Sequence, residues 1–148
     1  MELRQLFNDL VRFEIELWNA VEARLKTDLA LPLTHYEPMT VMDDVKGCRV
    51  YDIANELRIT TGGASKLVDR IEESGYCLRR PNPNDRRSSL VELTPAGRRV
   101  LVKARAIVDE ELQRRLGGVA SNRELGEFMS TLGRLRAASQ RGDQERTA

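Results

Sequence analysis

The segment that most restricts the fold is residues 81–97, which reads PNPNDRRSSLVELTPAG. It opens as a polar loop stiffened by two prolines and tipped by Arg86 and Arg87. The chain then returns as a short apolar strand over 89–93. It stops at Thr94-Pro95, where a capping hydroxyl followed by proline marks the start of a helix. The segment therefore predicts a narrow β-hairpin with a basic tip, followed at once by a helix.

Two short helical patterns joined by a tight turn precede this hairpin. The first helix is predicted over 50–57, and the turn is Arg58-Ile59-Thr60. Thr60 or Thr61 caps the second helix, which Gly75 closes. Its apolar stripe consists of Ala64, Leu67, Val68 and Ile71. With residues 76–79 as the outgoing strand and 80–87 as the loop, this order predicts a winged helix-turn-helix, a fold that usually reads duplex DNA.

Further helices flank this region. Apolar residues recur at helical spacing over 2–30 with no Gly or Pro, which predicts one long helix before a break at 31–33. A capping box of Thr34 and Glu37 predicts that a second helix starts there, with Pro38 in its first turn, and it is expected to end near Val45 to Gly47. After Thr94, a helix of about 20 residues is expected to end at Gly117-Gly118. Ser121 and Glu124 form a second capping box before the last helix, and residues after Ala138 are expected to fray.

The expected fold class is thus mainly α with a small β-hairpin wing. We predict one compact domain per subunit with four parts: an N-terminal dimerisation helix over 1–33, the DNA-binding region over 34–97, C-terminal dimerisation helices over 98–138, and a frayed tail over 139–148. The long helices carry more apolar surface than the small central module covers, so we expect a second copy to cover the remainder. The alternative is a monomeric bundle whose terminal helices cover one another.

Composition narrows the function. The net charge is +1, yet the segment 79–105 holds eight basic and two acidic residues, so its local charge of +6 is balanced by an acidic remainder. Such an asymmetry steers a protein toward a polyanion, although a solvated basic helix face would look the same.

Two widely spaced cysteines suggest neither a disulfide framework nor a metal site, and no cofactor is expected. One histidine and the absence of a nucleophile elbow or a phosphate loop argue against an enzyme. No apolar run approaches the ~20 residues of a membrane span, and no secretory signal is present, so a cytoplasmic location is expected.

If the second helix of the pair buries its apolar stripe, its remaining residues face outward, and its N-terminal part enters the major groove. Two glycines on that face leave few side chains for reading bases, so we expect much of the specificity to come from the wing and from DNA shape. At the wing tip an arginine can enter a narrow minor groove, and Asp85 is expected to hold the guanidinium of Arg87. The residues predicted to contact DNA are Thr61, Gly62, Gly63, Ser65, Lys66, Arg70, Asp85, Arg86 and Arg87.

The segments LVDRIEESGYCLRR (67–80) and DRRSSLVELTPAG (85–97) resemble the DNA-binding core of the MarR/SlyA family of transcriptional regulators, and the flanking helices extend the similarity along nearly the whole chain. The resemblance implies a homodimer of triangular outline that binds a pseudo-palindromic operator, usually as a repressor. It implies a recognition helix over Thr61–Ser74 and wing contacts from Asp85 and Arg87. This sequence departs from the family at Gly62-Gly63, where members often carry polar side chains.

The resemblance also implies a control mechanism. Many such regulators release DNA when a small aromatic or phenolic anion binds between the dimer helices and the DNA-binding lobe. The candidates for such contacts are Trp18, His35, Tyr36, Met39 and Met42, although the tryptophan and methionines also fit an ordinary core and His35 fits a solvated first turn. A redox-responsive regulator is an alternative, because Arg49 beside Cys48 could lower the pKa of that thiol. A winged helix that binds protein instead of DNA is another.

Overall fold

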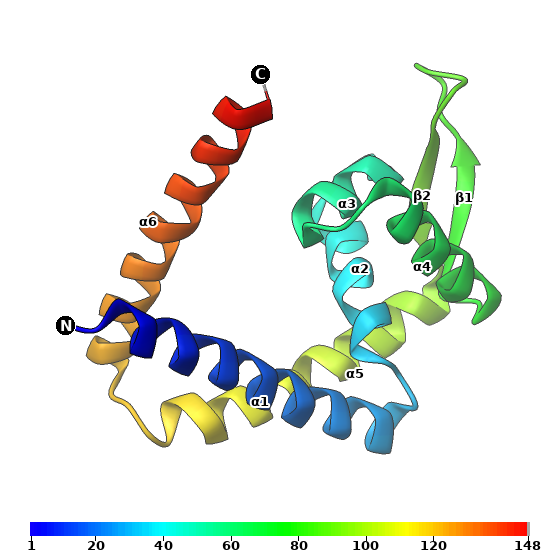
Figure 1. Ribbon diagram of the computed structural model, residues 1–148. Coiled ribbons are helices and arrows are strands. Elements are labelled where there is room, and N and C mark those ends of the chain that lie inside the picture. Colours follow the sequence, from blue (N-terminus) through cyan, green and yellow to red (C-terminus); the bar gives the residue numbers. More distant parts are fainter. Residues whose placement is uncertain (148) are drawn as a thin grey trace. The chain divides into compact units, whose positions relative to one another are not determined.

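The computed structural model describes residues 1–147, which form two compact units, one spanning residues 1–109 and the other beginning at Glu110. Its elements are α1 (Leu3–Leu29), α2 (Leu33–Asp44), α3 (Val50–Leu57), α4 (Thr61–Glu73), β1 (Cys77–Pro81), β2 (Ser89–Leu93), α5 (Pro95–Leu112), the π-helical turn η1 (Gln113–Gly117) and α6 (Asn122–Thr147). The predicted class, helices plus one β-hairpin, is confirmed (Figure 1). None of the helices within 1–147 combines the length and the apolar character that crossing a membrane requires.

The core of the first unit forms where α2, α3 and α4 pack on one another, with the C-terminal part of α1 packed on α2. The predicted stripe of α4 is largely confirmed, because Ala64, Val68 and Ile71 are fully buried while Leu67 is only partly so. The first half of α1 lies outside this core, and most of its apolar side chains are exposed. The core therefore leaves α4 with one buried face and one solvent face.

The hairpin of β1 and β2 is antiparallel, with Cys77 opposite Leu93 and Pro81 opposite Ser89. We call this hairpin, with its connecting residues 82–88, the wing. The inner ends of its strands are buried, and a single bridge between Arg49 and Leu90 extends the ladder on the far side of β2. In Figure 1 the wing extends beyond the ends of α3 and α4. The wing is thus fixed at its base and solvated at its tip.

The predicted start of α2 is wrong. The helix begins at Leu33, one residue before the predicted Thr34 cap, and the amides of His35 and Tyr36 donate to the carbonyl of Pro32 at 2.9 and 3.0 Å. Leu33 is only 3% exposed, so its burial draws it into the first turn, where Thr34 no longer has the extended backbone of a cap. Pro38 consequently lies in the second turn and not in the first.

The second unit contains the end of α5, η1 and α6. The predicted helix end at Gly117-Gly118 is confirmed, although the last turn is a π-helix and not an α-helix. Beside it, the carboxylate of Glu111 accepts hydrogen bonds from Arg114 and Arg115, both at 2.7 Å, which lower the pKa of Glu111 to about 2.

The start of α6 is also as predicted. The amide of Ser121 donates to Glu124 at 2.8 Å, and the amide of Glu124 donates back to the Ser121 hydroxyl at 3.3 Å. The tail over 139–148, which was predicted to fray, is instead helical as far as the structure describes it, because α6 continues to Thr147. Residues 139–146 are exposed, but the Gln, Arg and Glu among them favour the helix by propensity. Ala148 lies outside the described residues.

Candidate nucleic-acid interface

The solvent face of α4 begins with a well-formed cap. The hydroxyl oxygen of Thr60 accepts the amide hydrogen of Gly63 at 3.0 Å, so Thr60 is the cap and Thr61 is the first helical residue. Beyond the cap, Lys66 and Arg70 are exposed and form no ion pair within residues 1–147. The structure therefore brings the predicted residues Thr61 to Arg70 together on one open, basic stretch of helix.

The two glycines at the start of α4 differ in what surrounds them. A Cβ atom added at Gly62 would meet no other atom within 4 Å, whereas one at Gly63 would lie 3.1 Å from the Thr60 hydroxyl. Packing inside the chain therefore does not require glycine at position 62. A glycine that costs helix stability and fills no tight space is typical of a position where something outside the helix approaches the backbone closely.

The wing tip carries the two other predicted arginines. Asp85 does not hold the guanidinium of Arg87 as predicted; its carboxylate accepts from the backbone amide of Arg87 at 2.9 Å. This bond forms because an aspartate in a turn reaches the amide two residues ahead more readily than a long, mobile guanidinium. Asn82 makes the same local bond to the amide of Asn84 at 3.0 Å. The tip backbone is thus ordered while Arg86 and Arg87 are exposed and form no ion pair within the described chain.

The basic segment 79–105 is less positive in the fold than in the sequence. Arg80 pairs with Glu92 across the hairpin at 2.7 Å, and Arg105 pairs with Asp43 and Asp44 of α2. Arg79 pairs with carboxylates of α4. Within residues 1–147, the cations of this segment without an ion pair are Arg86, Arg87, Arg98, Arg99 and Lys103. The charge available to a polyanion is therefore concentrated at the wing tip and at the start of α5.

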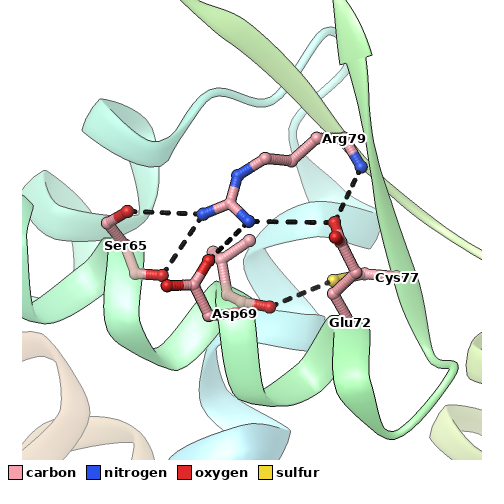
Figure 2. A network of polar contacts seen from close by, with 6 residues as sticks. Ser65, Asp69, Glu72, Cys77 and Arg79 are labelled. Carbon is pink, nitrogen blue, oxygen red and sulfur yellow. Dashed lines mark hydrogen bonds and ion pairs between the residues drawn. The ribbon is translucent and has the colours of Figure 1, made fainter.

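Arg79, so far considered only as one positive charge of the segment 79–105, connects the wing to α4 (Figure 2). Its guanidinium donates to Asp69 at 2.7 Å and to both the carbonyl and the hydroxyl of Ser65 at 3.3 Å. Its backbone amide donates to Glu72 at 3.2 Å. Ser65, Asp69 and Glu72 are spaced four and three residues apart, so they lie on one face of α4. This spacing could have indicated that a basic residue of the following strand contacts all three.

Comparison with known proteins agrees with this geometry. The family model described as "MarR family" matches residues 31–89, which run from the start of α2 to the start of β2. This part of the chain matches a MarR-family domain. It is 31% identical over 65 residues to the multiple antibiotic resistance protein MarR of Escherichia coli K12, a match that covers 44% of this chain and 45% of the relative. The chain thus spans about half the length of that relative.

Solved structures share the fold more completely. CouR from Rhodococcus jostii RHA1, bound to p-coumaroyl-CoA, is 27% identical with a TM-score of 0.75, and the match covers 83% of this chain and 85% of CouR. A structure of the transcriptional repressor CouR bound to a 23-mer DNA duplex has a TM-score of 0.80 at 22% identity, covering 92% and 98%. Nearly the whole chain therefore has the fold of CouR.

The five residues predicted to contact an effector differ in their surroundings. Met39 is fully buried and Met42 nearly so, as expected of an ordinary core, and the indole N–H of Trp18 donates to Glu22 at 3.0 Å. His35 and Tyr36 are partly buried. Burial lowers the pKa of His35, aided by the charge of Arg70, and raises that of Tyr36.

A cleft of about 280 Å³ lies between the end of α2, the loop after it, β2 and the start of α5. Of the five candidates, only Met42 lines it. An effector site in this chain therefore stays a prediction.

The cysteines do not have the surroundings of a redox sensor. Cys48 is 2% exposed, and burial with the nearby Asp52 raises its pKa to about 11. Arg49 lowers the pKa, but it is the smallest of the three causes, and it is paired with Asp52. The pKa of Cys77 is raised to about 12, chiefly by burial. Since thiolate is the reactive form, the prediction that Arg49 activates Cys48 is wrong.

Thiol labelling checks this conclusion. We expect Cys48 and Cys77 of the native protein to react with a disulfide reagent at pH 7.5 at least ~100-fold more slowly than in the unfolded chain, because burial suppresses both thiolate formation and access. The rates are read from the absorbance of the released thiol with and without denaturant. Rapid labelling of one cysteine in the native protein would restore the redox alternative.

Proposed function

We propose that this MarR-family chain is a homodimeric regulator that places α4 in the major groove and the wing in the adjacent minor groove of an operator. The observation that carries the proposal is the wing tip, where Arg86 and Arg87 form no ion pair with any described residue, on an ordered turn that Arg79 ties to α4. Free guanidinium groups on a narrow hairpin suit the negative potential of an A·T-rich minor groove. Arg98, Arg99 and Lys103 add positive charge near the base of the wing.

The face of α4 divides into contacts of different kinds. Thr61, Lys66 and Arg70 have side chains free to reach phosphates or base edges. Gly62 and Gly63 offer backbone only. Ser65 shares its hydroxyl oxygen with Arg79, which leaves its hydrogen for a phosphate. With so few free side chains for the bases, we infer that the wing and DNA shape supply much of the specificity.

Exposed apolar side chains support a dimer. On α1 these are Leu3, Leu6, Phe7, Val11, Phe13 and Ile15. On α6 they are Phe128, Met129, Leu132 and Leu135. Two stripes of this size are unusual on a monomer, and a second copy that covers them would place two recognition helices about 34 Å apart on one face of the DNA.

We further propose that the protein acts as a repressor and that a phenolic anion releases it. The support is CouR, which is 27% identical and whose structure holds p-coumaroyl-CoA. Trp18, His35, Tyr36, Met39 and Met42 stay the candidate contacts. A ligand releases DNA only if it binds the released conformation more tightly, so affinity for the ligand must fall by the same factor when DNA is bound.

Two measurements on the purified chain test the core of this proposal. Light scattering after size exclusion is expected to give twice the mass of one chain. Fluorescence anisotropy with a duplex from upstream of the protein's own reading frame is expected to show binding that weakens steeply with salt. Single subunits in solution, or indifference to duplexes at low ionic strength, would rule it out. Binding to a protein partner with little salt dependence would favour the winged-helix interaction module instead.

Gly62→Ala separates the effect of this glycine on helix stability from its effect on DNA binding. We expect the unfolding free energy to rise by up to about 1 kcal/mol, because alanine favours the helix and the new methyl group meets nothing. We expect DNA affinity to fall, because the methyl group stands where the backbone approaches DNA. Urea unfolding and anisotropy on the same preparation measure the two effects. Equal affinity with raised stability would show that position 62 lies away from the DNA.

A further inference from the structure

We propose that Arg79 is a positioning residue that fixes the wing against the recognition helix, so that Asp69 and Glu72 strengthen DNA binding although their charge opposes it. The inference rests on the proposed use of α4 and the wing. Arg79, Asp69 and Glu72 were not among the predicted contacts.

The contacts act at two levels. The Arg79 guanidinium bonds Asp69 at 2.7 Å and Ser65 at 3.3 Å, and lies 3.8 Å from Glu72. Its backbone amide donates separately to Glu72 at 3.2 Å. The side chain is 27% exposed, less than those of Asp69 (57%) and Glu72 (44%), so it lies against the helix and is not extended into solvent. Both the main chain and the side chain of β1 are therefore attached to about two turns of α4 (Figure 2).

The wing needs such an attachment. A two-stranded hairpin is marginally stable alone, and Arg79 lies at the middle of β1, opposite Val91. The free arginines follow seven and eight residues later, at the end of the hairpin. Without the contact, the hairpin would sample several directions, and the ordering would have to occur on binding at a cost in affinity.

Charge alone predicts the opposite change in DNA affinity when Asp69 and Glu72 are neutralised. Asp69 and Glu72 are exposed carboxylates on the helix proposed to enter the groove, and removing negative charge near phosphates ordinarily tightens binding. If they serve as the anchor for Arg79, neutralising them has the reverse effect. The sign of the change therefore distinguishes positioning from simple electrostatics.

The test compares Asp69→Asn/Glu72→Gln with Glu73→Gln. Glu73 is an exposed carboxylate on the same helix with no ion pair within residues 1–147, so its neutralisation reports charge alone. We expect the control to bind the operator duplex up to about twofold more tightly and the double variant to bind about tenfold more weakly. Arg79→Lys keeps the charge but not the forked geometry, and we expect it also to weaken binding. Arg79→Lys replaces the double variant as the test if circular dichroism and thermal melting show that the double variant does not fold.

A second readout excludes a general structural defect. We expect Arg87→Ala to cost about tenfold in the wild-type background and clearly less with Asp69→Asn/Glu72→Gln, because an unfixed wing delivers its arginine poorly. Binding by the double variant as tight as that of Glu73→Gln, or an undiminished cost of Arg87→Ala, overturns the inference. If the wild type itself ignores duplex DNA, the proposed function fails and not the contact geometry.

Discussion

Gly97→Ala is expected to destabilise the first unit by about 3 kcal/mol, the upper part of the range for overpacking. A Cβ atom at this position would lie 2.0 Å from the carbonyl oxygen of Tyr76 and 2.9 Å from its carbonyl carbon. Both are backbone atoms, so no side-chain rotation relieves the clash. Either the start of α5 or the entry to β1 has to move.

The movement is costly because the same atoms are hydrogen-bonded. The amide of Thr94 donates to that Tyr76 carbonyl at 3.0 Å, and the Thr94 hydroxyl donates to the carbonyl of Gly75 at 2.6 Å. The Thr94 hydroxyl also accepts from the amide of Gly97 at 3.0 Å, as the predicted cap requires. Displacing the glycine therefore disturbs both the cap of α5 and the closure of the wing.

Urea unfolding followed by circular dichroism measures the effect as a lowered midpoint. Gly62→Ala is the matched control, since it is the same substitution in the same unit at a position where the Cβ meets nothing. The two variants are expected to shift the midpoint in opposite directions. A wild-type midpoint for Gly97→Ala would contradict the close approach of Gly97 to Tyr76.

The local features of this fold could be predicted from the sequence because each depends on neighbouring residues. The return strand 89–93, the Thr94 and Thr60 caps and the helix pair lie where turn, cap and periodicity patterns indicated them. The start of α2 could not be found in this way. The capping pattern at Thr34 competes with burial of Leu33, and which one prevails depends on the core that Leu33 enters.

The electrostatics of the site were harder to predict, because ion pairs join distant segments. Arg105 is neutralised by Asp43, 62 residues earlier, and Arg80 by Glu92 across the hairpin. A charge count along the chain treats all of these arginines as free. The predicted effect of Arg49 on the pKa of Cys48 fails for a related reason. Arg49 is visible in the sequence beside Cys48, whereas the burial that dominates the pKa of Cys48 is a property of the fold.

This difference between free and paired arginines leads to the second large effect. Arg87→Ala should weaken operator binding about tenfold at low salt, and Arg86→Ala/Arg87→Ala about 100-fold, if each guanidinium makes one good groove or phosphate contact. The slope of log affinity against log salt should fall by roughly one unit for the single variant and two for the double. Anisotropy titrations between about 0.05 and 0.3 M salt give both quantities, because counterion release is resolved over that range. The largest losses of affinity are expected on duplexes whose wing-contacted steps are A·T-rich.

Arg80→Ala is the matched control because it removes the same side chain from the same hairpin. Arg80 is exposed, but its guanidinium lies 2.7 Å from Glu92, so its charge is already compensated and a phosphate would have to displace the carboxylate. We therefore expect a loss of only about twofold and little change in the salt slope. If Arg80→Ala and Arg87→Ala cost the same, binding would depend on the total charge of the hairpin. A much larger cost at Arg87 would mean that the wing acts through its ordered, unpaired tip, the part of the molecule that the Asp85 turn and the Arg79 contact hold in place.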